Sequence, residues 1–373
     1  MKTFYFTAII AAILFICNNG ILAQEGEFAP LNPAFVRYLE QTKSQELKKG
    51  NTVNPFRPAP SPLQLNFANY KSAGSSQTKN GTISLLPKRF DLRDSGWVTP
   101  VKNQGKYYTC WAFAAMAAIE SNWLVNHWGA FDLSEQNISA CNGVQVAYDG
   151  GGSHLVSSSY LTRFAGPVLE ADDPYKPPNI CKGIQFPVPR YVFTSRILPY
   201  DPELIKRTIM KYGGINFGMM AGFIWNKNFT GFDFDKANYN PVDYTFYYSG
   251  SADFDHVVCL VGWDDDKIIT GGDKSPKGTK GAWIVKNSLG ADWGENGYFY
   301  LSYFDNKSPM PLFHFDESAD TSEIDRVNMY DEIGATKAFG YNNEIGYGIT
   351  RFNAPEKEII VKVGTYILSA ASS

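Results

Sequence analysis

Two neighbouring runs decide the fold of this chain: Val98-Thr-Pro-Val-Lys-Asn-Gln-Gly105 and, after a short loop, Cys110-Trp-Ala-Phe-Ala-Ala-Met-Ala-Ala-Ile119. The alanine-rich run predicts a long, largely buried helix from Cys110 to Trp128, and Gly129 supplies its stop signal. A cysteine at a helix N-terminus has its thiolate stabilised by backbone N–H groups and the helix dipole. A lone cysteine is more often a core thiol, so a catalytic role requires a histidine base and a group that orients it.

Three later segments supply candidates for these partners. They are Leu133-Ser-Glu-Gln136 with Cys141, Asp255-His256-Val-Val258 with Gly262-Trp263, and Lys286-Asn287-Ser288 with Trp293-Gly-Glu-Asn-Gly-Tyr298. In this order, and together with the runs around Cys110, the segments resemble those of the papain family of cysteine peptidases. The resemblance covers roughly residues 87–304.

The order of the predicted elements indicates an α+β protein, because helices come first and strands later. Further helices are expected from Ser134 as N-cap, over Ser153–Phe164 and over Pro202–Tyr212, and strands over His256–Trp263, Gly281–Lys286 and Tyr298–Tyr303. The resemblance implies a two-lobed papain-like fold. Its helical lobe would carry the cysteine, and its β-barrel-like lobe would carry the histidine and the asparagine.

The resemblance also implies a role for each matching residue. Cys110 would be the nucleophile, and His256 would form an ion pair with it and later protonate the leaving amine. Asn287 would orient the imidazole, and Gln104 would donate an N–H to the developing oxyanion. These roles describe an endopeptidase that works through a thioester acyl-enzyme. The alternative is a weakly active or inactive protein on the same scaffold that binds peptides or glycans.

The spacing of the motifs points to an insertion. In papain-type enzymes the histidine and asparagine follow the cysteine by about 130–150 residues. His256 lies 146 residues after Cys110, whereas Asn287 lies 177 residues after it. A loop from Asp264 to Lys280 explains the excess. Its three leading acidic residues admit a calcium site, but a solvated loop is the favoured interpretation, and no metal or cofactor is expected.

Two residues beside the expected site depart from the family pattern. Tyr107-Tyr108-Thr109 stands where the family usually has Cys-Gly-Ser. The resemblance implies that Tyr108, at a glycine position, either narrows the cleft or imposes strain, which would make cleavage selective or slow. Leu289 replaces the tryptophan that usually shields the Asn–His hydrogen bond from water. By the same resemblance, the expected substrate-binding residues are Tyr108, Gly151, Gly152, Phe254, Val257 and Trp293. His127 and His314 are expected to be structural or surface residues, and so is His154 unless it lies near the cleft.

Four cysteines remain once Cys17 is assigned to an N-terminal signal. On count alone they allow two bridges in an oxidising compartment, with three connectivities. The family resemblance implies one bridge instead, between Cys141 and Cys181, with Cys110 and Cys259 as free thiols.

The remaining segments suggest export and processing. Residues 1–23 have a basic start, a short apolar run and a small-residue exit, as in a secretory signal; an uncleaved anchor is the alternative. Residues 24–86 are polar and proline-rich and are expected to form a pro-segment or a spacer, with a short helix over Phe35–Glu40. Residues 305–373 are expected to form a β-rich extension, resembling part of the lectin-like domain of a bacterial branch of the family.

Composition limits the partners. Lys and Arg (34) nearly balance Asp and Glu (37), which argues against a nucleic-acid binder. The expectation is a secreted or extracytoplasmic monomer without a stable membrane anchor. It would act on polypeptides and could bind glycans through the C-terminal extension.

Overall fold

The computed structural model describes residues 27–28, 31–33, 35–37, 40, 86–143, 151–177, 180–183, 185–225, 232–252, 254–272, 278–305, 312–323 and 339–340. Its helices are α3 (Cys110–Val125), α4 (Glu135–Ala140), α5 (His154–Thr162), α6 (Pro202–Tyr212) and the 3-10 helix η1 (Thr321–Glu323). Its strands are β1 (Glu27–Phe28), β2 (Arg89–Asp91), β3 (Arg190–Leu198), β4 (Ile215–Met219), β5 (Phe223–Trp225), β6 (Phe232–Phe234), β7 (Tyr239–Asn240), β8 (Thr245–Phe246), β9 (His256–Ile268), β10 (Lys280–Lys286), β11 (Tyr298–Ser302), β12 (Leu312–Asp320) and β13 (Phe339–Gly340).

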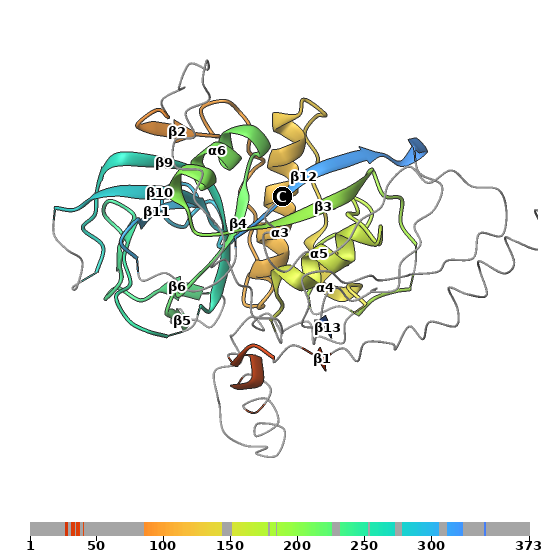
Figure 1. Ribbon diagram of the computed structural model, residues 1–373, viewed down its shortest axis with the longest axis horizontal. Coiled ribbons are helices and arrows are strands. Elements are labelled where there is room, and N and C mark those ends of the chain that lie inside the picture. Colours follow the sequence, from red (N-terminus) through yellow and green to blue (C-terminus); the bar gives the residue numbers. More distant parts are fainter. Residues whose placement is uncertain are drawn as a thin grey trace, which may run out of the picture.

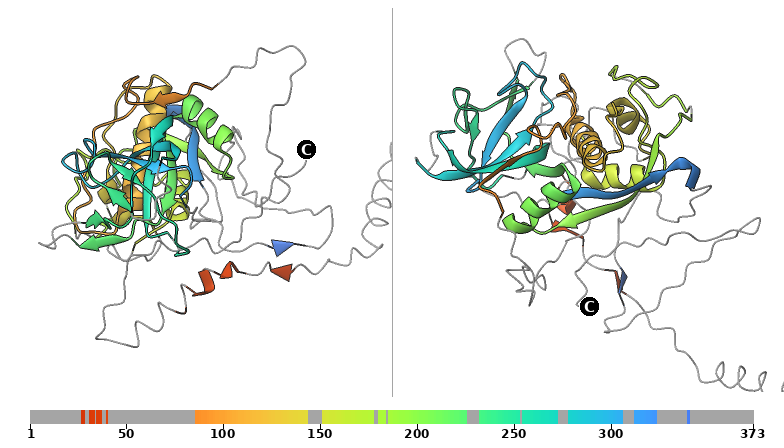
Figure 2. Two further views of the ribbon diagram at one scale, coloured as in Figure 1. Left: turned by 90° about the vertical axis from the view of Figure 1, so that its left-hand side faces the viewer. Right: turned by 90° about the horizontal axis from the view of Figure 1, so that it is seen from above.

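Helix α3 lies at the centre of the molecule, with strands β9, β10 and β11 on one side and helices α4 and α5 on the other (Figure 1). The view from above shows the same arrangement, with α3 seen nearly along its axis (Figure 2). Thirteen of its sixteen residues are buried, as expected for a helix that is covered all round. The division into a helical side and a strand-rich side around α3 agrees with the expected two-lobed α+β fold.

A nine-stranded sheet organises the β-rich side. Its strands run in the order β3-β12-β4-β9-β10-β11-β8-β7, and β2 also pairs with β9. The chain approaches α3 closely at Gly214, immediately before β4, where a Cβ would lie 2.5 Å from Cys259 Sγ and 3.3 Å from Ala118 Cα. This close approach fixes the sheet against the helix that begins at Cys110.

The helix starts are set by their caps. Ser134 Oγ accepts a hydrogen bond from Asn137 N at the start of α4, and Asp201 accepts from two backbone N–H groups at the start of α6. Helix α3 ends at Val125, three residues before the predicted Trp128. His127 adopts a left-handed conformation (φ 59°), and Trp128 N donates to Trp123 O, so the chain reverses before reaching Gly129.

The prediction of a loop over Asp264–Lys280 is wrong for its first residues, because β9 continues to Ile268 and pairs with both β2 and β10. Its acidic residues are held by cations on the neighbouring elements. Asp265 bonds to Lys206, and Asp266 lies 3.5 Å from Lys88. These ion pairs compensate the charge along a strand that also holds the histidine at its other end. Among the described residues, no group of three or more His, Cys, Asp or Glu side chains is arranged to hold a metal ion.

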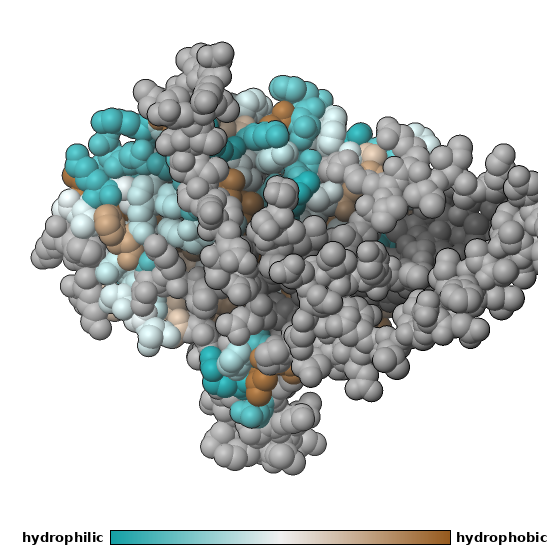
Figure 3. All heavy atoms as spheres, viewed as in Figure 1, coloured by the Kyte–Doolittle hydropathy of each residue, from teal (hydrophilic) through white to brown (hydrophobic). Residues whose placement is uncertain are grey.

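Strand β12 extends the sheet beyond residue 304, where the resemblance ended, by pairing with β3 and β4. Strand β1 from the N-terminal region pairs with β13. The predicted signal, most of the expected pro-segment and most of residues 305–373 lie outside the described residues. In the described part of the chain, no helix is long and apolar enough to cross a membrane. On the face shown in Figure 3, the surface of the described residues around β2 and α6 is mainly hydrophilic.

Candidate active site

The nucleophile candidate Cys110 is the first residue of α3, as the sequence predicts. Thr109 occupies the N-cap, but its side chain does not cap the helix. Its hydroxyl instead lies 2.7 Å from the Tyr175 hydroxyl. The N–H groups of Ala112 and Phe113 donate to Thr109 O, whereas those of Cys110 and Trp111 act on the thiol, where a developing thiolate also gains from the helix dipole.

The thiol of Cys110 is buried, with 4% of the residue exposed. Burial raises its pKa to about 12, while backbone hydrogen bonds at Val257 and at the start of α3 lower it. Val257 directly follows His256, so the thiol lies against the strand that carries the imidazole. Because burial alone favours the neutral thiol, an ion pair at this site depends on mutual attraction between thiolate and imidazolium.

His256 and Asn287 meet where β9 begins and β10 ends. His256 Nε2 lies 2.8 Å from Asn287 Oδ1, and Nδ1 has no hydrogen-bond partner among the residues that the structure describes. The Asn287 oxygen also accepts from Ser288 N at 2.9 Å, so the amide is fixed with its oxygen toward the ring. Asn287 therefore orients the imidazole through one nitrogen and leaves the other available to react.

The imidazole is completely buried and surrounded by aromatic rings. Burial lowers the pKa of His256 to about 4, although the hydrogen bond to Asn287 Oδ1 raises it. The ring of Phe223 packs edge-on at a centroid distance of 4.5 Å, and Phe234 lies at 6.0 Å. Leu289 packs against the same core. The aromatic cover over the imidazole thus comes from β5 and β6, where the family pattern has a tryptophan at position 289.

Gln104 is buried and held from three sides. Its Oε1 accepts from Ser288 Oγ at 2.5 Å, its Nε2 donates to Tyr107 O at 2.7 Å, and its backbone N donates to Ser288 O at 2.8 Å. An amide nitrogen carries two hydrogens, so one remains for a substrate oxygen. The side chain is fixed to the strand end that carries Asn287, which joins the two lobes at this point.

Tyr175 is a positioning residue that the sequence analysis does not single out. Its hydroxyl donates to Gln104 O at 2.9 Å and so accepts from Thr109 Oγ1. The tyrosine ring also packs edge-on against Phe113 at 4.9 Å. One hydroxyl thus holds both ends of the loop 104–109. Its sequence signal is its place in the Asp173-Pro-Tyr-Lys176 stretch that leads to Cys181.

Asp255 anchors the neighbouring hairpin. Its carboxylate accepts hydrogen bonds from the N–H groups of Ala221 (2.6 Å), Gly222 (3.1 Å) and Phe223 (3.3 Å). Burial raises its pKa to about 6, although these hydrogen bonds lower it. The residue before the histidine therefore fixes the start of β5 beside the imidazole. Its adjacency to His256 is the only sequence signal for this role.

The expected substrate-binding residues have different surroundings in the structure. Tyr108 contacts Phe232 of β6, and Gly152 packs so tightly on Trp111 that a Cβ would lie 2.3 Å from the indole. Trp293 stacks on Tyr239 and donates to Asp233. The remaining expected residues, Gly151, Phe254 and Val257, are buried.

The other histidines lie elsewhere in the fold. His154 stacks on Phe313 of β12 at a centroid distance of 3.9 Å, and neither of its ring nitrogens has a partner within the described part of the chain. Burial lowers its pKa to about 3. His314 packs against Tyr212 of α6. Both are neutral packing residues in the core.

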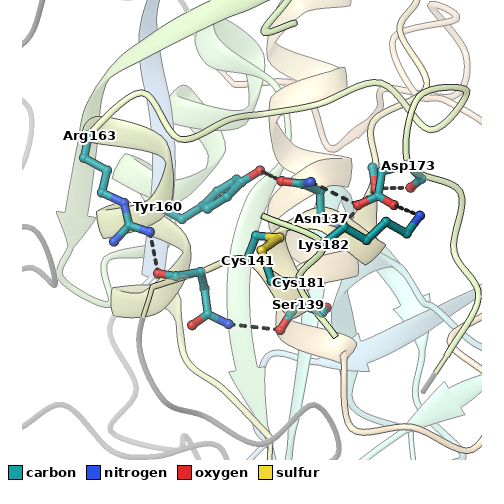
Figure 4. The surroundings of a disulfide bond; sticks show 10 residues. Asn137, Ser139, Cys141, Tyr160, Arg163, Asp173, Cys181 and Lys182 are labelled. Atoms are coloured by element: carbon teal, nitrogen blue, oxygen red, sulfur yellow. Dashed lines mark hydrogen bonds and ion pairs between the residues drawn. A yellow bond between two sulfur atoms is a disulfide. The ribbon is translucent and has the colours of Figure 1, made fainter. Parts of the chain in front are cut away.

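The structure contains the disulfide that the resemblance implies, Cys141–Cys181, and Cys110 and Cys259 are free, buried thiols. The bridge ties the end of α4 to the segment after Asp173 (Figure 4). Asp173 accepts from Asn137 Nδ2 at 3.0 Å and pairs with Lys182 at 3.3 Å. The bridge therefore supports the same segment that presents Tyr175 to the loop before Cys110.

A buried thiol at a helix N-terminus, an imidazole held by an amide and a second amide beside the thiol loop define a cysteine-hydrolase type of site. The comparisons give the family. The model of the papain family cysteine protease matches residues 86–310, and the chain belongs to this family.

Curated relatives are similar to this chain in sequence, and a solved structure is similar to it in fold. A viral cathepsin of Heliothis zea nuclear polyhedrosis virus is 31% identical over 241 residues, 63% of this chain and 58% of the relative. Cysteine proteinase 1 of Dictyostelium discoideum is 29% identical over 237 residues, 59% of this chain and 62% of the relative. The solved cysteine protease and lectin-like domains of a surface-layer associated protein of Clostridium difficile match in fold with a TM-score of 0.63 at 24% identity, over 79% of this chain and 61% of that one. The chain spans less than two thirds of the length of each.

Proposed function

We propose that this chain is a secreted cysteine endopeptidase that cleaves peptide bonds at Cys110. The observation that carries the proposal is the state of His256, whose Nε2 is bound by Asn287 while its buried Nδ1 has no partner in the described residues. A buried nitrogen without a partner is costly, and the imidazole of His256, unlike that of His154, directly precedes the residue against which the Cys110 thiol lies. Proton exchange with this thiol gives the nitrogen a use.

The reaction uses residues in distinct roles. The Cys110 thiolate attacks the peptide carbonyl carbon, and the resulting oxyanion receives an N–H from Gln104 Nε2 and from the backbone of Cys110. His256 gives its proton to the leaving amine as the C–N bond breaks, which leaves a thioester. Water, deprotonated by His256, then hydrolyses the thioester and restores the thiol.

Labelling with an epoxide-type thiol inhibitor tests the proposal. The inhibitor should modify Cys110 and abolish hydrolysis of unfolded protein under conditions that keep the disulfide intact. Cys259 is a matched internal control, because it is also a buried free thiol but lies on β9 away from the start of α3. Cys110→Ala should remove both label and activity. A folded protein without label at Cys110 would favour the alternative, a binding protein on the same scaffold.

Export is part of the proposal. The signal-like residues 1–23 and the Cys141–Cys181 bridge support it, because disulfides persist in oxidising compartments. Cleavage after Ala23, removal of residues 24–86, a monomeric state and glycan binding through residues 305–373 stay predictions. N-terminal sequencing of the exported protein tests the first two, and retention of intact cytosolic chain would contradict them.

A further inference from the structure

A row of aromatic rings crosses from the loop before Cys110 to the imidazole. Tyr108 packs on Phe232 at a centroid distance of 5.3 Å, Phe232 packs on Phe223 at 4.9 Å, and Phe223 packs on His256 at 4.5 Å. We call Tyr108, Phe232 and Phe223 the aromatic bridge. Tyr108 belongs to the loop before α3, and the two phenylalanines belong to the β5–β6 hairpin of the strand-rich lobe. The bridge thus joins the two lobes beside the reacting residues.

We propose that the Tyr108–Phe232 contact determines which residues are accepted after the scissile bond, and that it selects small ones. The inference rests on the proposed peptidase function. His256 is the group that protonates the leaving amine, so chain on the leaving side of the substrate must pass the imidazole. The aromatic bridge packs against this ring and occupies space there.

Burial supports this placement. Cys110, His256 and Phe232 are all buried, and Tyr108 is the half-buried outer member of the row. Substrate chain that passes the imidazole on the leaving side therefore meets the aromatic bridge, whose outer contact is Tyr108–Phe232. Glycine or alanine after the scissile bond requires the smallest displacement, whereas a bulky side chain competes with Tyr108 for the face of Phe232.

The anchoring of each partner shows which one moves. The start of β5 is held by three hydrogen bonds to the Asp255 carboxylate, so the hairpin cannot leave without breaking them. The backbone before Tyr108 is held where Tyr107 O accepts from Gln104 Nε2. Rotation of the Tyr108 side chain about its own bonds disturbs neither anchor. Tyr108 is therefore the member that opens.

Removing the tyrosine ring should reverse the selection. In Tyr108→Gly the face of Phe232 becomes available to the substrate, and an aromatic side chain after the scissile bond can pack on it as Tyr108 does. In Phe232→Ala the space opens without an aromatic face to bind. The two variants should therefore differ in preference, although both enlarge the site.

Two internally quenched peptides that differ only after the scissile bond, with glycine or phenylalanine there, test the inference. We expect kcat/KM of the wild type to favour glycine at least tenfold. Tyr108→Gly should shift this ratio at least tenfold toward phenylalanine, and Phe232→Ala should bring it toward one. The double variant should match Phe232→Ala, because both substitutions remove one contact. Tyr191→Ala, which breaks a ring pair with Phe164, should leave the ratio unchanged.

Alkylation with iodoacetamide, a small reagent for thiols, distinguishes failure of the proposed peptidase function from failure of the inference about Tyr108. If Cys110 is not alkylated in any folded variant, including Tyr108→Gly, the proposed peptidase function fails. If Cys110 is alkylated and both peptides are cleaved, but the glycine-to-phenylalanine ratio is the same in wild type and Tyr108→Gly, the inference about Tyr108 is wrong and the peptidase function stands.

Discussion

Gln104 illustrates how single residues are positioned in this site. Its oxygen is held by Ser288 Oγ and one of its amide hydrogens by Tyr107 O, so the second hydrogen has a fixed direction. Fixed donors are effective because they need no reorganisation as charge develops. Gln104→Ala should lower kcat by about 10²–10³ with little change in KM. Steady-state kinetics checks this, and a change confined to KM would assign Gln104 to substrate binding instead.

Tyr175 acts through other residues. Tyr175→Phe keeps the ring contact with Phe113 but removes the hydroxyl that binds Gln104 O and Thr109 Oγ1. If the lost hydrogen bonds raise the activation free energy by about 1.4 kcal/mol, kcat falls about tenfold. Tyr303→Phe is the matched control, because its hydroxyl bonds to Asp265 on β9 instead. Both variants should lose similar stability in denaturant unfolding, whereas only Tyr175→Phe should lower kcat. Equal kcat values for the two variants would mean that Tyr175 has only a structural role.

The sequence predicts the reacting residues because their chemistry is local. The helix start at Cys110 and the motifs around His256 and Asn287 can be recognised within short windows, and in the structure Cys110 begins α3 and His256 Nε2 lies 2.8 Å from Asn287 Oδ1. The residues around them depend on contacts between distant segments. Phe223 and Phe234 lie in a stretch without a motif, and only the packing of β5 and β6 brings them to His256.

At the scale of elements, a buried charge cluster joins α3, α4 and the loop that leads to Gln104. Lys102 Nζ lies 3.0 Å from carboxylate oxygens of both Glu120 and Glu135, and Glu120 also accepts from Leu133 N and Thr99 Oγ1. Burial lowers the pKa of Lys102, but Glu135 and Glu120 raise it further, so the ammonium stays charged. The cluster is stable only while its members remain paired.

Lys102→Met should therefore be strongly destabilising. It leaves two buried carboxylates without their cation, which costs about 3–5 kcal/mol of the free energy of unfolding. Arg207→Met is the matched control, because its partner Glu203 is exposed on α6 and such pairs contribute about 0.5 kcal/mol or less. Denaturant unfolding monitored by circular dichroism compares the two. Equal losses would mean that water or a protonated carboxyl replaces the cation.

The elements themselves were predictable to different degrees. Helices α4 and α6 start where their caps and Pro202 indicate, since these signals act within a few residues. Strand β9 extends past the predicted end because its acidic residues find cations on other elements. Strands β3 and β12 were not predicted, and β3 lacks a regular alternation, because the apolar run Tyr191-Val-Phe193 is followed by the polar run Thr194-Ser-Arg196. Their pairing joins segments more than a hundred residues apart, which no local pattern encodes.

Across the whole molecule, buried histidines make stability depend on pH. Burial lowers the pKa of His154 to about 3 and of His256 and His314 to about 4. Between these values and about 6.5 the unfolded chain binds protons that the folded chain does not. The stability contributed by each histidine is therefore complete above about pH 6.5 and is lost as the pH falls toward the folded pKa.

Two buried carboxyl groups act in the opposite direction. Burial raises the pKa of Asp255 to about 6 and of Asp305 to about 7, although backbone hydrogen bonds lower both values. Between an unfolded pKa of about 3.9 and these values the folded chain binds the extra proton. Their contribution is complete below about pH 3.9 and is lost as the pH rises through 6 to 7. The two sets of groups offset each other between about pH 4 and 6.

A pair of variants separates these opposing titrations. His154→Phe keeps the stacking on Phe313 and removes a titrating group without hydrogen-bond partners in the described structure. Relative to the wild type, its free energy of unfolding should rise by about 2 kcal/mol between pH 6.5 and pH 4.5. Asp305→Asn keeps an oxygen that can accept from Tyr248 N, and its relative free energy should fall by a similar amount over the same change. Urea unfolding at the two pH values measures both changes. If the relative free energies of unfolding of the two variants change in the same direction, these two groups do not control the pH dependence of stability.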